Sequence, residues 1–565
     1  VASGSRNGAV ATRFTGQGTL RKSGDGQSLW GASAATFAMA AGSLIDVQGG
    51  SFVGGSSANE DWRLNQSALN VAAGARFEGV EANVRVDGLS GGGRISSGFA
   101  GAGYTAFTLG VADGSGDFAG ELADSSPGHA GHFVKVGGGT QTLRGASTFT
   151  GGFSIDGGTV ALAGGSNRLP TGITVHIRNG ATLDLGGTAQ TLTGLGTVGD
   201  RVVGNLGAGS LFTSNGVFLQ RGRVDATLQG GGSAFLQRLW IGGDATATVL
   251  LNGSNDMVYS ADHNQVIIGH GTTGAAGTVR VGQANALAAA TEGVQVFAGT
   301  LDLHGVTAVR ARDIALLGGA ASALVNSDTA RGASFQQGVV LGTAAASRVG
   351  GAGHLALGGT ISGPGAIDKV GAGMLLLSGT NSHSGGTTVS GGVLSVARDA
   401  NLGSGSLQLQ GGTLRNTGAF ITARQVTLGA GGGTFDTAGG FLTVNGAVDG
   451  SGGLTKTGND ILTLAGAKTY SGATVVTAGT LKLAANGASA LHVASPGIAV
   501  AAGARVLFTG TQAYAGTITG AGQLVHEFGG TTMLTGTALH TGGTLISGGT
   551  LQVGDGGRRC ALACD

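Results

Sequence analysis

A chain of 565 residues with 118 glycines but only four prolines is neither collagen nor a flexible linker, because collagen needs abundant proline and a three-residue period. Its 41% hydrophobic content at a net charge of +1 excludes intrinsic disorder, and the scattered charges exclude a polybasic surface for nucleic acid. No run of eighteen apolar residues predicts a transmembrane helix. This composition favours many short strands separated by tight glycine turns.

Residues 1–130 are predicted to form an N-terminal cap and irregular first coils. The segment 22–26 echoes the start of a repeat that is clearer later in the chain. The rhythm of glycine and apolar residues lapses at 59–65, where charges surround one of three tryptophans. Arg and large aromatic residues are common in binding sites, so this segment is a predicted partner-binding loop. Its candidate contacts are Glu60, Asp61, Trp62 and Arg63, although Trp62 could equally cap the first coils.

Residues 131–360 are predicted to contain one clear repeat, several diluted repeats and loop insertions. The rhythm lapses again at 252–265. This second predicted binding loop offers Asp256, Met257, Tyr259 and His263.

Four segments align without gaps and begin at Lys135, Lys369, Lys456 and His526. Every copy has leucine at offset 8 and glycine at offsets 10, 16 and 23. A β-branched residue stands at offset 20, and apolar residues stand at offsets 25 and 27. The residues at offsets 8 and 10 are Leu143, Gly145, Leu377, Gly379, Leu464, Gly466, Leu534 and Gly536. The most regular repeats fall in residues 361–553, and residues 554–565 are a tail.

The spacing predicts an all-β fold, a right-handed parallel β-helix or solenoid with a single elongated stem and loop protrusions. Stretches such as 461–464 and 480–483 alternate apolar and polar residues, as half-buried strands do. One repeat cannot bury its apolar face alone, but stacked coils pair every strand and place leucine over leucine. Repeated two-residue hairpin signals are lacking, which favours parallel coils over an antiparallel sandwich. A β-propeller competes, yet its periodic aromatic residues are not found.

Chemical motifs in the sequence are weak. Ser90 lies in a G-x-S-x-G pattern, but chance produces such matches at this glycine and serine content, and no helix-forming stretch follows. His129 and His132 lie close together without further metal ligands nearby, and Asp113–Asp117 is a single Asp/Gly turn. Cys560 and Cys564 either form a local disulfide or are incidental. We therefore expect no catalysis, no cofactor and no metal.

The repeats resemble the passenger-associated repeats of autotransporters with a pertactin-like β-helix. The resemblance is closest in Gly453–Gly458, Leu462–Gly466 and Thr469–Thr474, and the repeat at 367–396 is nearly as close. It implies a bacterial virulence protein, exposed at the cell surface or secreted and carried by its own C-terminal β-barrel translocator. No train of alternating strands follows residue 553, so this barrel is expected outside the chain.

Within this family, the chain length and the segment 81–89 most resemble Bordetella virulence-activated passengers. That resemblance implies capture of a host serum regulator, the serpin C1 esterase inhibitor, and hence complement evasion by a monomer. An adhesin or a self-associating passenger for attachment or biofilm is the alternative. A small-molecule substrate is not expected.

Overall fold

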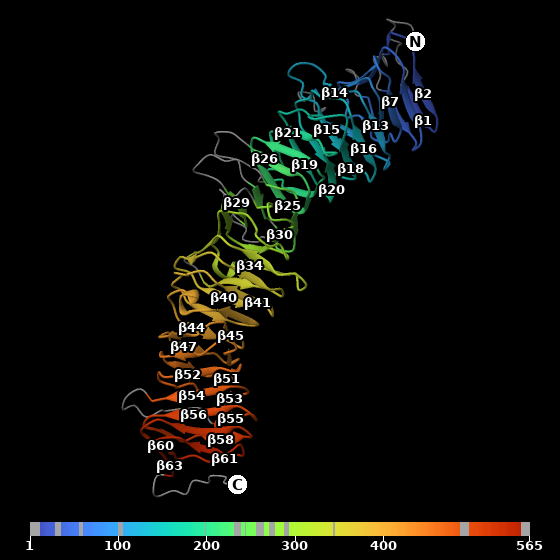
Figure 1. Cartoon of the computed structure of the whole chain (residues 1–565). Helices are drawn as coiled ribbons and strands as arrows, with labels where there is room; N and C mark the ends of the chain where they lie inside the picture. Colours follow the sequence, from blue (N-terminus) through green and yellow to red (C-terminus); the bar gives the residue numbers. More distant parts are fainter. Residues whose placement is uncertain are drawn as a thin grey trace. The chain divides into compact units, whose positions relative to one another are not determined.

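The computed structural model describes residues 12–28, 35–55, 60–99, 106–197, 199–230, 239–242, 244–255, 265–269, 277–287, 293–342, 345–485 and 497–554. The chain divides into two compact units, Val1–Gly293 and Val294–Asp565. Each unit is a stack of coils built from short strands (Figure 1).

The strands of the first unit form ladders in which each strand pairs with its counterpart in the next coil. The first ladder contains β2 (Thr19–Lys22), β5 (Leu44–Val47), β7 (Ala68–Val71), β10 (Leu89–Gly91), β13 (Gly116–Phe118), β16 (Thr140–Leu143), β18 (Thr159–Leu162), β20 (Ala181–Asp184), β23 (Val202–Leu206), β25 (Val217–Val224), β28 (Thr248–Leu251) and β30 (Thr278–Val281). The second contains β9 (Arg85–Val86), β12 (Ala106–Leu109), β15 (His132–Lys135), β17 (Phe153–Ile155), β19 (Thr174–Ile177), β22 (Gly194–Leu195), β25 again, β27 (Leu239–Ile241) and β29 (Gln265–Ile268). Shorter ladders contain β3 (Gln27–Ser28), β6 (Ser51–Gly55), β8 (Arg76–Gly79), β11 (Arg94–Ser97) and β14 (Glu121–Asp124), then β21 (Ala189–Leu192), β24 (Ser210–Thr213) and β26 (Thr227–Gly230), with β1 (Arg13–Gly16) paired to β4 (Thr36–Met39).

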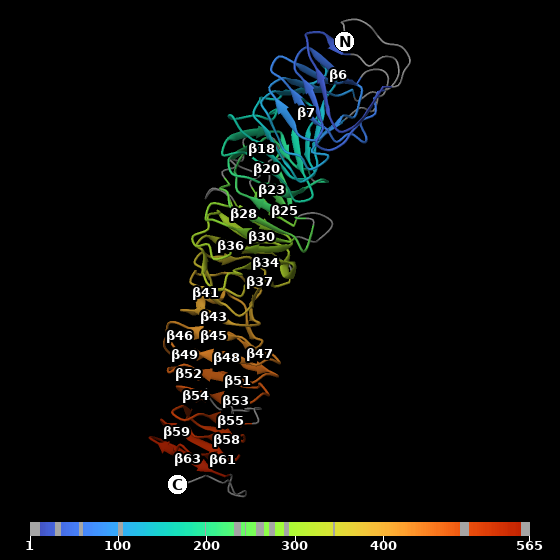
Figure 2. The same ribbon diagram turned by 90° about the vertical axis from the view of Figure 1, so that its right-hand side faces the viewer.

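The second unit repeats this plan with more regular coils (Figure 2). Its longest ladder contains β35 (Ala333–Phe335), β38 (Leu355–Leu357), β41 (Met374–Leu377), β43 (Val393–Val396), β45 (Thr413–Asn416), β48 (Gly433–Asp436), β51 (Leu454–Thr457), β53 (Thr474–Val476), β55 (Gly497–Val500), β58 (Thr517–Gly520) and β61 (Ala538–His540). A neighbouring ladder contains β46 (Phe420–Thr422), β49 (Leu442–Val444), β52 (Ile461–Leu464), β54 (Thr480–Ala484), β56 (Arg505–Thr509), β59 (Gln523–Glu527) and β62 (Thr544–Ile546), and a short one contains β57 (Gln512–Tyr514), β60 (Thr531–Leu534) and β63 (Thr550–Val553). The others contain β32 (Gly299–Asp302), β34 (Ser322–Val325), β37 (Ser347–Gly350), β40 (Ile367–Val370), β42 (Thr387–Val389), β44 (Leu407–Leu409), β47 (Val426–Leu428) and β50 (Val448–Gly450), and β31 (Gly293–Val296), β33 (Asp313–Leu316), β36 (Gly338–Leu341) and β39 (Ile361–Ser362). Among the described residues, the short 3₁₀ helices Gly319–Ala321 and Asp399–Leu402 interrupt the strands.

The predicted parallel β-solenoid is confirmed. The strand pairings are parallel throughout the described residues, which agrees with stacked coils and not with the antiparallel blades of a propeller. Coil length varies more in the first unit than in the second. It runs from 17 residues between Ser210 and Thr227 to 30 between Thr248 and Thr278 in the first unit. In the second it runs from 18 residues between Arg505 and Gln523 to 25 between Thr480 and Arg505.

The core of each unit is a set of inward-facing rows that cross from coil to coil. One row of the second unit consists of Leu375, Leu394, Leu414, Phe435, Lys456, Val476 and Val500, all at most 2% exposed. The lysine in this row occupies a position that is otherwise apolar. The glycines at offset 10 permit the close stacking, because a Cβ on Gly379 or Gly466 would lie 2.1 Å from a carbonyl oxygen of the coil before.

The core of the first coils of the first unit contains a series of aromatic rings. Phe37 stacks on Phe14 with centroids 5.0 Å apart, and further ring contacts continue coil by coil to Phe153. The intermediate rings are Phe52, Phe77, Phe107, Phe133 and Phe149, each with a centroid between 4.7 and 6.1 Å from its neighbour. Stacked and edge-on ring pairs add stability beyond the area that they bury.

Candidate functional site

The lysine that begins three of the four repeats is fully buried and binds backbone carbonyl groups. The ammonium nitrogen of Lys456 donates to the carbonyl oxygens of Thr457 at 2.8 Å, Gly458 at 2.7 Å and Ala478 at 3.0 Å. The first two oxygens belong to the turn after the lysine, and the third belongs to the next coil. We call this arrangement the carbonyl nest: the oxygens at offsets 1 and 2 and one oxygen of the following coil.

The other lysines have the same geometry. Lys369 donates to Val370, Gly371 and Gly391 at 3.0, 2.8 and 3.0 Å. Lys135 donates to Val136, Gly137 and Gly157 at 2.6, 2.9 and 3.3 Å. Each lysine therefore fastens its own turn to the coil that follows.

The glycines at offsets 2 and 23 explain why the nest can form. Gly458 has φ of 78° and Gly479 has φ of 65°, a backbone conformation that L side chains rarely adopt. The equivalent glycines of the other lysine repeats have φ between 62° and 78°. These turns direct successive carbonyl groups towards one point, and the ammonium group lies there.

A fourth lysine, outside the four aligned segments, builds the same nest. Lys22 lies at the end of β2 and donates to Ser23 at 3.1 Å, Gly24 at 2.6 Å and Gly49 at 2.9 Å. Gly24 and Gly50 have φ of 75° and 59°, so both turns are retained. In the sequence, the resemblance of residues 22–26 to the start of a repeat pointed to Lys22. The coil that follows Lys22 is longer, so the residue that supplies the third carbonyl stands at a different offset from the lysine than in the aligned repeats.

Burial of these ammonium groups makes the charged form less favourable. Desolvation lowers the pKa of Lys369 and Lys456 to about 8, and it lowers the pKa of Lys135 as well. Lys369 and Lys456 therefore remain largely protonated at neutral pH. Three hydrogen bonds from each charged group offset its desolvation.

A second feature that recurs in the repeats is a pair of buried side chains at offsets 14 and 18. Tyr470 Oη lies 2.7 Å from Thr474 Oγ1, and His383 Nε2 lies 3.1 Å from Thr387 Oγ1. The fourth repeat has His540 Nε2 2.8 Å from Thr544 Oγ1. The first repeat has two phenylalanines at these offsets, Phe149 and Phe153, with centroids 6.0 Å apart. Both members change together, so the pair is either polar or apolar in each repeat.

The predicted binding loop at 60–63 is mainly buried. Trp62 is 1% exposed, donates its Nε1–H to the Gly54 carbonyl at 2.7 Å, and stacks on Phe37 at 3.9 Å. Glu60 is 6% exposed. Asp61 binds Arg63, whose side chain is 86% exposed, and Leu64 beside it is 74% exposed. Trp62 thus belongs to the core of the first coils. Binding by this segment stays a prediction, and its accessible side chains are Arg63 and Leu64.

The four candidate residues of the second predicted loop, Asp256, Met257, Tyr259 and His263, lie outside the described residues, and so do Cys560 and Cys564.

The weaker chemical motifs have ordinary structural surroundings. Ser90 lies in β10 and its hydroxyl donates to Asn70 Oδ1 at 3.1 Å. His129 contacts Ser126 Oγ at 2.7 Å, whereas His132 contacts the Gly151 carbonyl at 2.8 Å and Ser154 Oγ at 3.3 Å. In the described part of the chain, no group of three or more His, Cys, Asp or Glu side chains could hold a metal ion. Nor does that part contain a helix long and apolar enough to cross a membrane.

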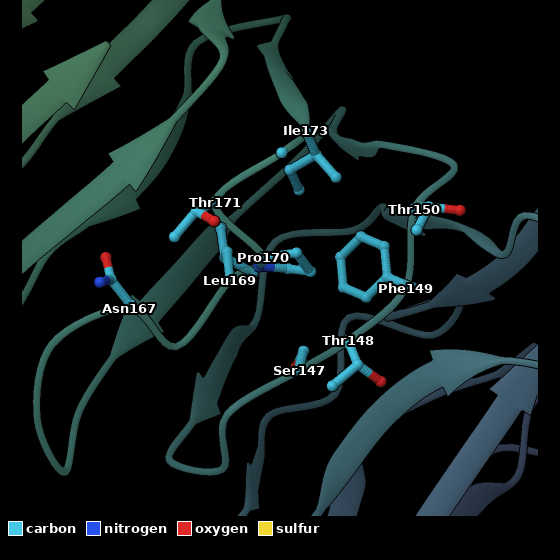
Figure 3. A pocket seen from close by; sticks show the side chains of 10 residues that line it. Ser147, Thr148, Phe149, Thr150, Asn167, Leu169, Pro170, Thr171 and Ile173 are labelled. Carbon is cyan, nitrogen blue, oxygen red and sulfur yellow. The ribbon is translucent and has the colours of Figure 1, made fainter. Parts of the chain in front are cut away.

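Hollows on the described part of the first unit include the following two. One of about 290 Å³ lies between residues 147–150 and 167–173, where the ring of Phe149 lies near Pro170 (Figure 3). No titratable side chain lines it. The other, of about 450 Å³, is floored by Gly and Ala residues of successive turns and carries Arg76, Arg94 and Glu121. Arg94 and Glu121 are 3.6 Å apart and partly neutralise one another.

The outer face of the second unit carries a group of exposed apolar side chains. Ile421 in β46 is 57% exposed, Phe441 just before β49 is 48% exposed, and Ile461 in β52 is 40% exposed. These strands are neighbours, with Leu442 paired to Leu462. Phe441 and Ile461 each precede one of these paired residues, so they lie side by side on adjacent coils. We call these three residues the apolar patch.

Comparison with known proteins identifies the repeats. Residues 133–162, 367–396, 454–483 and 529–553 match the passenger-associated-transport-repeat family. An adhesin BmaC autotransporter from Brucella suis biovar 1 (strain 1330) is 36% identical over 101 residues. This alignment covers 18% of the chain and 3% of the relative. No solved structure is significantly similar to the chain.

The chain thus carries passenger-associated transport repeats on a parallel β-solenoid. The matches support an autotransporter passenger that is exposed at the cell surface or secreted. Three of the matched ranges contain the buried lysines, and the fourth begins shortly after His526.

Proposed function

We propose that this chain is an adhesin-class passenger that binds a host protein through the outer face of its solenoid and does not act as an enzyme. The relative described as an adhesin supports the class. The nests and buried pairs make the coils rigid, and a rigid scaffold holds surface side chains in place for binding.

The apolar patch carries this proposal. Exposed apolar side chains that cluster on adjacent coils mark interaction surfaces more often than isolated ones do. A flat ladder presents them at a fixed spacing of about 4.8 Å between coils. Ile421, Phe441 and Ile461 together offer a contact surface that a folded protein partner can cover.

A narrower form of the proposal concerns the partner. Resemblance to Bordetella virulence-activated passengers favours a serum regulator, C1 esterase inhibitor, and hence complement evasion. An adhesin that attaches to cells or to copies of itself is supported equally by the name of the relative.

The test uses the purified chain with human serum, with host cells and alone. A monodisperse complex with a serum protein, identified by mass spectrometry, would support capture of a regulator. Binding to cells without such a complex would support cell adhesion, and concentration-dependent assembly in sedimentation would support self-association.

The double variant Phe441→Ser/Ile461→Thr tests whether the partner binds at the apolar patch. We expect it to weaken binding of the identified partner at least about tenfold, because core contacts of an interface contribute most of its energy. The matched control is Thr443→Ser/Thr463→Ser on the same outer face. Equal affinity of both variants and the wild type would remove the patch from the proposal.

A further inference from the structure

The fourth repeat has a carbonyl nest without a lysine. His526 takes the lysine position and is 0% exposed, with Phe508 and Ile546 as its strand neighbours in the coils before and after. Within the described residues, neither ring nitrogen of His526 has a hydrogen-bond partner. A buried polar group without a partner is unfavourable, so it indicates that something binds there.

The turns of this nest are nevertheless kept. Gly549 at offset 23 has φ of 76°, as its counterparts do. Phe528 replaces glycine at offset 2 and still has φ of 65°, which is strained for a bulky side chain. The backbone therefore holds the nest conformation although the residue at offset 2 disfavours it and the lysine is missing.

His526 is aimed at this nest. The point where a Cβ of Gly549 would lie is 2.6 Å from the carbonyl oxygens of Phe528 and Gly530 and 2.7 Å from His526 Nε2. In the lysine repeats, the corresponding points on Gly392 and Gly479 are also surrounded by carbonyl oxygens, at 2.4 to 2.8 Å. The imidazole nitrogen thus lies beside a turn of the same geometry, in which the carbonyl oxygen at offset 2 receives an ammonium group in the lysine repeats.

We propose that the nest of the fourth repeat is a binding site for a small monovalent cation, potassium or ammonium. Backbone carbonyls would be its main ligands, and His526 Nε2 would add one more. Carbonyl oxygens can replace the hydration shell of such an ion. In the other repeats a tethered ammonium binds the same oxygens at 2.6 to 3.3 Å.

The charge of the site favours a monovalent ion over a divalent one. Calcium and magnesium sites in proteins contain carboxylate ligands, and zinc sites contain several His or Cys side chains. The nest offers neutral oxygens and one imidazole, and the strand neighbours of His526 are apolar. The bound cation would fasten the turn at Phe528 to the last described coil, as Lys456 fastens its own turn.

Hydrogen exchange of the full chain tests this proposal. Exchange is compared in potassium, ammonium and choline chloride at equal ionic strength and the same pH. We expect amides of residues 523–553 to exchange about tenfold more slowly in potassium or ammonium than in choline. Residues 454–483 are the internal control, because Lys456 already fills their nest, and their exchange should not depend on the cation.

The variant His526→Lys supplies a tethered ammonium. It should make residues 523–553 equally protected in all three salts. A second measurement does not depend on the variant: thallium(I), a potassium substitute, should give an anomalous diffraction signal beside His526.

One result would overturn the proposal: wild-type exchange at residues 523–553 that is the same in all three salts, with no thallium signal.

Discussion

The two units bury different kinds of side chain. The first coils of the first unit stack aromatic rings from Phe14 to Phe153, and Trp62 lies against them. The second unit places more titratable groups in its core, among them Lys369, His383 and Tyr470, although the first unit also buries Lys135. Stacked rings contribute stability at any pH, whereas buried titratable groups link stability to pH. The same solenoid thus tolerates a core of aromatic rings or one with many polar groups.

The largest expected effect concerns the aromatic core. Trp62→Ala should destabilise the first unit by about 3–5 kcal/mol, because it removes a buried ring and its hydrogen bond. Denaturant unfolding followed by hydrogen exchange in residues 36–109 measures this loss. The control Arg63→Ala changes an exposed side chain and should stay within about 0.5 kcal/mol. A small effect of both variants would contradict the role assigned to the ring stack.

The second prediction concerns pH. Burial first, and the nearby charge of Arg424 second, lower the pKa of His383 from 6.5 to about 4. The unfolded chain therefore binds the proton more readily than the folded chain between these values. We expect the second unit to lose about 3 kcal/mol as the pH falls from 6.5 to 4, and the first coils to change less.

Urea unfolding at several pH values checks this difference. His383→Gln should flatten the pH dependence of the second unit and keep a donor near Thr387. His354→Gln, at an exposed position, is the control and should leave the dependence unchanged. An identical slope in the wild type and His383→Gln would assign the pH dependence to other groups.

The third prediction concerns the nests. Lys456→Met keeps most of the aliphatic stem but leaves three carbonyl groups without their donor, and we expect a loss of about 2 kcal/mol. Lys482→Met is the matched control: this lysine is half-buried over the ring of Phe528, 5.3 Å from its centroid. It should lose no more than about 1 kcal/mol. Equal losses in thermal unfolding would mean that the nest contributes no more than a surface contact.

The smallest expected effect concerns the pair at offsets 14 and 18. Tyr470→Phe should cost about 1 kcal/mol, because it removes one buried hydrogen bond. Thr474→Val and the double variant complete a cycle, which should give a coupling energy of about 1 kcal/mol. Additive losses would show that the two side chains are merely neighbours.

The repeat was predictable because the same contacts recur at fixed spacings along the chain. Glycines at offsets 10, 16 and 23 follow from backbone crowding between coils, and the apolar residues at offsets 25 and 27 alternate as inward positions do. The burial of Trp62 was not predictable from its charged neighbours, because only the Phe37 and Phe77 rings of other coils decide it. The exposed side chains of that segment, Arg63 and Leu64, do lie within the predicted loop.

The sequence by itself therefore determined the strand period, the turns and the stacking of parallel coils, since these depend on residues a few positions apart. Only the tertiary structure decided what the repeat residues do. In the sequence, the lysine at the start of three of the repeats is simply a charged residue. In the structure it is buried, and its hydrogen bond to a carbonyl group of the following coil holds the two coils together. The contacts between coils also show that Lys22 belongs with the three repeat lysines. Within the described residues, His526 at the equivalent position has no hydrogen-bond partner for its ring. Contacts between coils depend on how many residues each coil contains, and that number varies from coil to coil.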